Sequence, residues 1–307
     1  MPNMVVIALC TYKRANLLPA LIEKLSIQIR ELSSDFTVRI AVIDNDPEGS
    51  AKSQLDNICR ILSGVEFTYC HEPARGVGNA RNRAFSLAED YEWLALFDDD
   101  QIPGPNWLRS LLEAPGRLPG DLFVGPVRPR LPRDRPDWAE GAWAWSRPEF
   151  DDGALRDHAG FGNILLSPSV LKDVACKVPE SFLEGPGEDT AVTSALSARG
   201  FKIVHVLDAW AWETVSTDRL SVPWVIARSR NAGRVWAMLA FEGKGNRVRL
   251  VLSLARLLSR AGGFGIRALV RHRSADVVRA KAQLATAHGY LSAFQEHLRR
   301  QIGAVRR

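Results

Sequence analysis

Short apolar segments alternate with amphipathic segments along the first third of the chain. Residues 17–29 carry leucine and isoleucine at three- and four-residue spacing, which predicts a helix that we expect Asn16 to cap. A second helix is predicted to open at the glycines near residue 76 and to run to residue 88. Runs that suit buried strands precede, separate and follow these helices, at residues 5–9, 38–43, 65–69 and 93–97. Alternating strands and helices at this spacing predict a mostly parallel sheet, with its loops collected on one rim.

The regular pattern weakens after residue 127. Residues 128–160 are rich in Pro, Arg and Trp and show few clean periodicities. A strand over 160–166, a helix over 188–199 and a strand over 201–207 are predicted to follow. Three tryptophans lie close together in the irregular part: Trp138, Trp143 and Trp145. Either they pack on the core, or their aromatic faces form a wall for an acceptor sugar or a lipid.

The last third of the chain is basic and helical. Residues 248–258 are largely aliphatic, and one polar stripe recurs at spacings of four, three and four: Arg249, Ser253, Arg256 and Arg260. From Arg228 to Arg307 there are 17 Lys/Arg and 3 Asp/Glu, a net charge of +14, whereas the preceding residues carry −9. A basic amphipathic helix is typical of proteins on anionic membranes. Docking on the domain or in a homo-oligomer is the alternative, and a terminal helix is predicted over 280–300.

Composition narrows the class of protein. With 307 residues, 46% of them apolar, the chain can bury one large core, or one domain and a smaller appendage. Its four cysteines show no metal-binding spacing, so we expect reduced core thiols of a cytosolic protein: Cys10, Cys59, Cys70 and Cys176. The N-terminal residues do not resemble a secretory signal, and no run of 18 apolar residues suits a spanning helix. No nucleic-acid module accompanies the basic charge, so nucleic acid is not an expected partner.

Three consecutive carboxylates follow the fourth predicted strand, at Asp98, Asp99 and Asp100. Adjacent carboxylates repel one another and need a cation to be held together. Oxygen ligands favour Mg²⁺ or Mn²⁺, whose natural anionic companion is a diphosphate. Other polar side chains are expected on the same rim: Thr11, Asp44, Asp46, Arg75 and Arg81. A nucleoside diphosphate would suit this rim, and a solvated acidic turn is the alternative.

Two glycine-containing segments carry weaker signals. Gly76 and Gly78 form only half of a dinucleotide fingerprint, and no acid ends a matching next strand, which argues against a Rossmann dehydrogenase. Glu188 and Asp189 follow a Gly/Pro-rich turn and open a predicted helix. Acids in a first helical turn often only complement the helix dipole.

Taken in order, the motifs carry a family resemblance. They are TYKR, VIDND, ARGVGNARNRA, LFDDDQIPGPNWL, GPVRP, GNILL, GPGEDT and WETVSTDRLSVPW. The chain resembles a family 2 glycosyltransferase over about residues 4 to 240, and it is particularly similar to the branch that builds succinoglycan-type exopolysaccharides. The resemblance implies the GT-A fold of nucleotide-diphospho-sugar transferases, which is a Rossmann-like, mixed, mostly parallel sheet flanked by helices. A basic helical C-terminal region would follow.

The resemblance also implies roles for single residues. Donor binding is expected of Thr11, Tyr12, Arg14, Asp44, Asp46, Arg75, Arg81, Asn82, Asp98 and Asp99. Asp98 and Asp100 match the outer positions of a DxD metal motif, with Glu213 as a further candidate ligand in place of a histidine. Asp189 matches the general base, and Glu188 matches its supporting acid. Acceptor contacts are expected from Asn163 and the three tryptophans.

These expectations add up to one hypothesis. Residues 1–240 form the transferase domain, with a nucleotide-binding half (1–127) and an acceptor-binding half (128–240), and residues 241–307 form the basic region. The enzyme is expected to be a metal-dependent inverting hexosyltransferase that uses UDP-glucose or UDP-galactose. A glycan or a lipid-linked glycan would be the acceptor, at the inner face of the cytoplasmic membrane. A catalytically inactive nucleotide-sugar-binding partner and a sugar nucleotidyltransferase are the alternatives.

Overall fold

The computed structural model describes residues 3–62, 64–173, 175–242 and 247–305, and these form two compact units. The first unit comprises Met1–Arg130 and Arg147–Thr214, and the second comprises Leu131–Ser146 and Val215–Arg307. This division falls before the boundary expected at residue 240. The reason is that α7 (Val222–Glu242) packs along α9 (Ser274–Val305) within the second unit.

An eight-stranded sheet forms the centre of the first unit, in the order β3-β2-β1-β4-β9-β6-β10-β8. Its strands are β1 (Asn3–Thr11), β2 (Phe36–Asp44), β3 (Glu66–His71), β4 (Trp93–Asp98), β6 (Leu122–Val124), β8 (Leu155–Arg156), β9 (Asn163–Leu166) and β10 (Ile203–His205). The strands from β3 to β4 are parallel, as are β6 and β10, whereas β9 runs antiparallel to β4 and β6. Strand β8 is antiparallel to β10. The predicted mixed, mostly parallel sheet is therefore confirmed.

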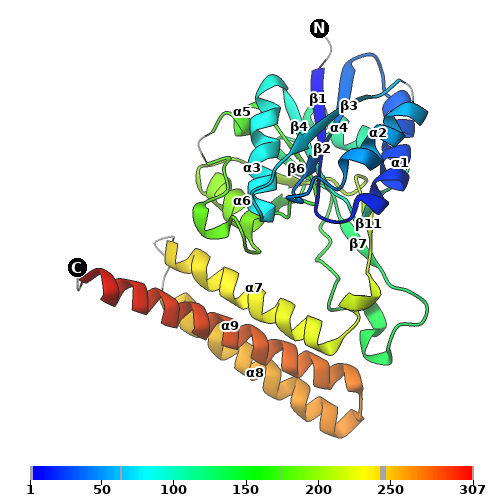
Figure 1. The fold of residues 1–307 in the computed structure, drawn as a ribbon. Helices are drawn as coiled ribbons and strands as arrows, with labels where there is room; N and C mark the ends of the chain where they lie inside the picture. The colour runs from blue at the N-terminus through cyan, green and yellow to red at the C-terminus, as the bar shows by residue number, and fades with distance from the viewer. Residues whose placement is uncertain (1–2, 63, 174, 243–246, 306–307) are drawn as a thin grey trace. The chain divides into compact units, whose positions relative to one another are not determined.

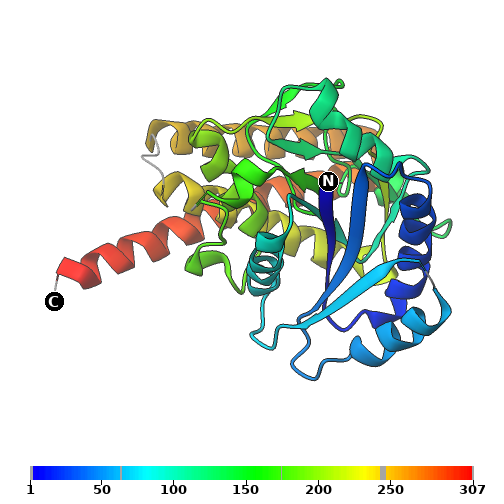
Figure 2. The same ribbon diagram turned by 90° about the horizontal axis from the view of Figure 1, so that it is seen from above.

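Helices cover both faces of this sheet, and a small second sheet lies in the same unit. The helices are η1 (Ala15–Leu17), α1 (Leu18–Arg30), α2 (Lys52–Ile61), α3 (Val77–Leu87), η2 (Ala88–Asp90), α4 (Trp107–Arg117), α5 (Pro168–Leu171), η4 (Glu180–Phe182) and α6 (Glu188–Ala198). The second sheet has the order β5 (Gln101–Pro103), β11 (Ala211–Thr214) and β7 (Val127–Arg130). Figures 1 and 2 show α1 and α3 on opposite faces of β1 and β2. Asn16 lies inside η1 and does not cap α1, because the regular helix begins only at Leu18.

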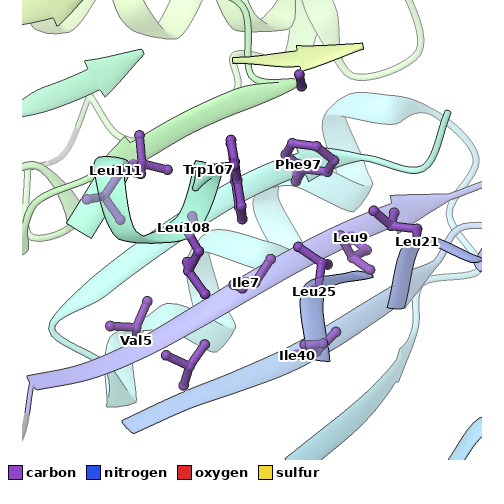
Figure 3. Close-up of a cluster of buried hydrophobic side chains, with 14 of the residues drawn as sticks. Val5, Ile7, Leu9, Leu21, Leu25, Ile40, Phe97, Trp107, Leu108 and Leu111 are labelled. Carbon is purple, nitrogen blue, oxygen red and sulfur yellow. The ribbon is translucent and has the colours of Figure 1, made fainter. Parts of the chain in front are cut away.

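Buried side chains around β1 and β4 fix the position of the carboxyl end of β4. Every residue from Val5 to Leu9 is 0% exposed, because helices cover this central strand on both faces. Val5, Ile7 and Leu9 belong to a cluster with side chains of α1 and α4 (Figure 3). Phe97 packs edge-to-face on Trp107 in the same cluster, with ring centroids 4.6 Å apart. The acids that follow Phe97 therefore begin at a fixed point. Outside the core, Cys59 is exposed on α2, contrary to the expectation of a core thiol.

Three long helices, α7, α8 (Arg247–Arg271) and α9, form most of the second unit and run side by side (Figure 1). Two short helices pack on them: η3 (Asp137–Ala142) contacts α9, and η5 (Thr217–Arg219) contacts α7. The basic helix predicted near residues 248–260 is α8, although the side chain of Arg249 lies outside the described residues. No helix in the described part of the chain combines the length and the apolar character needed to cross a bilayer.

The clustered tryptophans contribute to the core of the second unit. Trp145 is 3% exposed and stacks between Trp138 and Trp224, with ring centroids 5.7 and 6.2 Å away. The indole N–H of Trp143 donates to the carbonyl of Trp138 at 3.0 Å. Of the two interpretations, the structure supports packing and does not support an acceptor wall, because these rings contact one another.

Candidate active site

The first unit has a topological switch point between β1 and β4. These strands are neighbours in the sheet, with Cys10 paired to Asp98 at their carboxyl ends. The chain continues from β1 to β2 on one side of β1, whereas β4 lies on the other side, so the two following loops diverge. In open α/β sheets such a divergence forms a crevice that binds ligands. A hydrogen bond connects the two loops here: the Thr11 hydroxyl donates to Asp99 Oδ2 at 2.7 Å.

The acidic triple at the end of β4 is held by arginines. Arg14 Nη1 lies 3.2 Å from Asp99 Oδ1 and 3.0 Å from Asp100 Oδ2, and Arg81 pairs with Asp98. Burial raises the pKa of Asp99 to about 6, although Thr11 and Arg14 act in the opposite direction. The need of these acids for cations, inferred from the sequence, is thus met by guanidinium groups. Carboxylate oxygens of this kind also fit a hard divalent cation.

A metal centre is not preassembled, however. Within the described ranges no three His, Cys, Asp or Glu side chains are grouped closely enough to hold a metal ion. Glu213, the further candidate ligand, lies on β11 opposite Gln101 and is 8% exposed. Its Oε2 pairs with Arg147 Nη2 at 3.0 Å. Asp98 and Asp100, each paired with an arginine, stay the predicted ligands of a divalent cation.

Arg81 offers unused hydrogen-bond donors beside Asp98. Its side chain is 4% exposed, and within the described residues no hydrogen-bond partner is assigned to Nε or Nη1. Burial lowers the pKa of Arg81, but Cys10, Asp98 and Glu188 more than offset this effect, so the guanidinium stays charged. A buried charge with unpaired donors is costly unless a ligand or water satisfies them. A phosphate oxygen is the acceptor that a guanidinium suits best.

Two glycines bring α3, which carries Arg81, close to the segment that precedes Glu188 and Asp189. Gly76 has φ +126°, and a Cβ there would lie 2.2 Å from the carbonyl oxygen of Leu183. A Cβ on Gly78 would lie 2.7 Å from Leu183 Cα, and the Gly78 N–H donates to the Leu183 carbonyl at 3.0 Å. Only glycine permits this approach of α3 to the segment that leads into α6. The glycine pair thus serves packing between two functional segments.

Glu188 and Asp189 occupy the first turn of α6, as predicted. Asp189 Oδ1 accepts hydrogen bonds from the backbone N–H of Thr190 at 2.6 Å and from its hydroxyl at 3.2 Å. Thr193, one turn later, exchanges hydrogen bonds with the backbone of Ala159 at 3.0 and 3.1 Å. This clamp fixes α6 against the segment that precedes β9. Among the described residues no hydrogen-bond partner is assigned to Asp189 Oδ2, which leaves that oxygen able to accept a proton.

Asp98 and Asp189 line one cavity of about 270 Å³. The segment that enters β9 separates them: a Cβ on Gly160 would lie 3.3 Å from Asp189 Oδ2, and one on Gly162 would lie 2.3 Å from Asp98 Oδ2. The glycines at these positions keep both carboxylates accessible from the same hollow. The two acidic motifs, 90 residues apart in the sequence, thus meet at one site.

Basic side chains that the sequence reasoning missed also line this cavity: Arg147, Arg156, His158 and His205. His205 ends β10 and is 1% exposed, and in the part of the chain that the structure describes neither ring nitrogen has a hydrogen-bond partner. Burial lowers the pKa of His205, which keeps the ring neutral and able to donate or accept. A polar residue at the end of a predicted strand could have indicated His205, but no spacing identifies the others.

The predicted nucleotide-binding acids after β2 hold their own loop. Asp44 is 0% exposed, and its Oδ2 accepts from the Ala51 N–H at 2.7 Å and from the Tyr69 hydroxyl at 3.1 Å. Asp46 is 2% exposed and accepts from the Glu48 N–H at 3.3 Å. Their carboxylates shape the rim through these bonds, and contact with a base or a ribose stays a prediction.

Two predicted amides serve the fold in the same way. Asn82 bonds to the backbone of Val178 with both ends of its side chain, at 2.8 and 3.4 Å. Asn163 is 1% exposed; it accepts from Trp107 Nε1 at 2.7 Å and donates to the carbonyl of Ala209 at 2.8 Å. Asn163 also lines the cavity that Asp98 and Asp189 share, and its acceptor contact stays a prediction. By contrast, Tyr12 and Arg75 are exposed on the rim, where a base or phosphate can reach them.

Glu188 gives a pH-dependent prediction. Burial, and next the charge of Asp189, raise the pKa of Glu188 to about 7. Between the unfolded pKa and this value the folded chain keeps a proton that the unfolded chain has lost, so its stability falls as the pH rises. We expect Glu188→Gln to stabilise the protein by roughly 1–3 kcal/mol at about pH 8, and by much less at about pH 5. Thermal unfolding at both pH values measures this, with Glu184→Gln in the preceding exposed turn as the control. A gain of equal size at both pH values would contradict the assignment.

Comparisons with known proteins bear on the family and the fold of this chain. The family model described as glycosyl transferase family 2 matches residues 6–166. The succinoglycan biosynthesis protein ExoM of Rhizobium meliloti (strain 1021) is 27% identical over 258 residues, which cover 83% of this chain and 81% of that protein. Among solved structures, the mannosyltransferase PcManGT from Pyrobaculum calidifontis in complex with GDP-Man and Mn²⁺ superposes with a TM-score of 0.65 at 16% identity. That match covers 96% of this chain and 88% of the other. GalNAc-T7 with UDP, GalNAc and Mn²⁺ gives a TM-score of 0.54 at 13% identity, covering 76% and 47% of the two chains.

Proposed function

Because this chain belongs to glycosyl transferase family 2 and is a glycosyltransferase with a GT-A fold, we propose that it transfers a hexose, with inversion, from a nucleoside diphosphate sugar to a hydroxyl group. The observation that carries this proposal is the cavity that Asp98 and Asp189 share. One carboxylate lies at the switch point, where a diphosphate would bind, and the other lies across the hollow, where an attacking alcohol would be deprotonated.

Donor binding is assigned to the rim of β1 and β4. Tyr12 is exposed for stacking on a base, and Arg14 and Arg81 provide guanidinium groups for the diphosphate. Asp98 and Asp100 would hold a divalent cation, Mn²⁺ or Mg²⁺, which supplies charge neutralisation of the departing diphosphate. When the diphosphate binds, it can draw the arginines away from the acids and so leave carboxylate oxygens for the cation. Arg75, exposed just before α3, would close over the same phosphates.

Acceptor activation is assigned to Asp189. Its Oδ1 is anchored by Thr190, whereas Oδ2 is adjacent to Gly160 at the cavity wall. From this wall it can take the proton of a hydroxyl that attacks the anomeric carbon from the face opposite the diphosphate, which inverts the configuration. Glu188, which interacts electrostatically with Arg81 and Asp189, positions the base. Direct attack by the hydroxyl, with inversion, requires no covalent intermediate on the enzyme.

The proposed pathway, donor and acceptor rest on the similarity to ExoM. ExoM carries the name of a succinoglycan biosynthesis protein, and we infer that this chain likewise acts in exopolysaccharide synthesis, with UDP-glucose or UDP-galactose as donor. The acceptor would be a glycan or a lipid-linked glycan at the inner face of the cytoplasmic membrane. The basic side chains of the cavity, Arg156 and His205 among them, can donate hydrogen bonds to acceptor oxygens.

A donor turnover assay tests the proposal. The protein is incubated with UDP-glucose or UDP-galactose and a lipid-linked glycan extract, and UDP release is measured with Mn²⁺, with Mg²⁺ and with excess EDTA. We expect metal-dependent UDP release that falls by about two orders of magnitude or more when the metal is chelated. Thermal stabilisation by a UDP-sugar without any UDP release would instead indicate a non-catalytic binding protein. Release of pyrophosphate from UTP and a sugar phosphate would indicate a nucleotidyltransferase.

A further inference from the structure

The turn that joins α8 to α9 encloses a second cavity, of about 330 Å³, far along the chain from the active-site motifs. Arginines dominate its lining, with two acids among them: Arg267, Arg271, Arg273, Arg279, Asp137 and Asp276. Helix α9 begins at Ser274 in the same lining, so the positive end of its dipole lies at this cavity. All of these residues belong to the second unit.

Positive charge in this cavity exceeds negative charge. Asp276 is 4% exposed and pairs with Arg279 at 3.6 Å. Within the described residues no ion pair is formed by Arg267, Arg271 or Arg273. Arg267, Arg271 and Arg273 are exposed around this cavity, and like charges gathered there repel one another unless an anion lies between them. The excess of positive charge around the cavity therefore favours an anionic ligand.

The arrangement of the arginines indicates which anion fits. Arg267 and Arg279 come from different helices and both lie near the Phe264 ring, 5.7 and 5.8 Å from its centroid. Planar guanidinium groups donate two parallel hydrogen bonds to phosphate or carboxylate oxygens. A phosphate can accept from several of them at once, because its oxygens point in different directions.

Large apolar side chains protrude on the same last turns of α8. Ile266, Leu269 and Val270 are 65%, 77% and 74% exposed, and they alternate along the helix with Arg267 and Arg271. A soluble phosphate compound would not require them. At a bilayer surface, by contrast, a lipid phosphate lies at the level of the arginines while apolar side chains enter the acyl boundary.

We propose that the α8–α9 turn is a binding site for the phosphate group of an anionic membrane lipid. The phosphate binds among Arg267, Arg271 and Arg273 at the N-terminus of α9, and Ile266, Leu269 and Val270 insert beside it. This site goes beyond the proposed transferase activity, and vesicle binding, which needs no donor sugar, tests it separately.

Vesicle sedimentation with matched arginine variants tests the site. The full chain is mixed with vesicles of phosphatidylcholine alone or of phosphatidylcholine with phosphatidylglycerol. The test variant is Arg267→Gln/Arg271→Gln. Its control is Arg256→Gln/Arg260→Gln, which removes the same charge from the same helix outside the cavity. We expect binding only to the anionic vesicles, about tenfold or more weaker for the test variant and changed by less than about threefold for the control. Equal losses in both variants would overturn the site, because diffuse charge attraction would then explain the binding.

Two further measurements separate the remaining outcomes. If the arginine variant is misfolded by circular dichroism, Leu269→Ser/Val270→Ser replaces it, because both side chains are largely exposed and can be changed without disturbing the packing. This variant is also expected to lose vesicle binding, and unchanged binding would overturn the proposed insertion. Inorganic phosphate serves as the second probe. If it raises the melting temperature of the parent protein but not of the arginine variant, while anionic vesicles do not bind, the cavity accepts a free phosphate compound and the lipid proposal fails.

Discussion

Asp189→Asn should lower kcat about a thousandfold or more while leaving the affinity for UDP nearly unchanged. The asparagine oxygen can still accept from the Thr190 N–H, which lies 2.6 Å from Asp189 Oδ1, so α6 should begin as before. The substitution removes the carboxylate that is proposed to take the acceptor proton at this wall of the cavity. General base catalysis contributes about 10²–10⁴ in rate, and this sets the expected loss. UDP release in the presence of acceptor gives kcat, and thermal shift with UDP and Mn²⁺ gives binding.

Glu184→Gln is the matched control, because it removes one negative charge from the exposed turn just before α6. Its kcat should stay within about twofold of the parent value, since a surface charge without a partner contributes little. Near-normal turnover of Asp189→Asn would exclude Asp189 as the base. A parallel loss of UDP affinity in that variant would instead indicate that Asp189 holds the donor site together.

The rim of the sheet was predictable because strand ends follow directly from apolar runs. The run that ends at Phe97 is buried in a central strand, so Asp98 has to emerge at the carboxyl edge. The same argument places Thr11 beside it, and their meeting at the switch point needs only the strand order. The turn before Glu188 likewise gave the start of α6.

The roles of the buried polar residues were not predictable, since they depend on contacts distant in sequence. Asp44 and Asn163 have the residue types of ligand-binding groups, yet Asp44 accepts from the Tyr69 hydroxyl and Asn163 donates to the Ala209 carbonyl, 25 and 46 residues away in sequence. Nothing in their local pattern distinguishes a clamp from a ligand. The tryptophans near residue 140 show the same limit, because their partner Trp224 follows about eighty residues later. Such assignments require the fold.

The cavity between the acidic motifs depends on glycines that had no assigned role at the sequence level. Gly162 precedes β9, and its carbonyl accepts from the Asp98 N–H at 3.1 Å, which ties the two backbones together. The backbone therefore cannot withdraw to make room for a side chain. A Cβ at this position would meet the Asp98 carboxylate at 2.3 Å and Gln101 Nε2 at 2.6 Å. The carboxylate is the part that can move.

Gly162→Ala should therefore impair the site more than the fold. Overpacking here is expected to cost about 1–3 kcal/mol of stability, whereas displacement of the carboxylate proposed to bind the metal, and of its Arg81 partner, should weaken Mn²⁺-dependent donor binding about a hundredfold. Gly116→Ala is the control, because a Cβ there has no heavy atom within 4 Å. Calorimetric titration of UDP with and without Mn²⁺ measures the effect on donor binding, and thermal unfolding measures the effect on stability. If Gly162→Ala kept the parental Mn²⁺ dependence of UDP binding, Asp98 would not be a metal ligand, and the grip on the diphosphate would have to come from Arg14 and Arg81 alone.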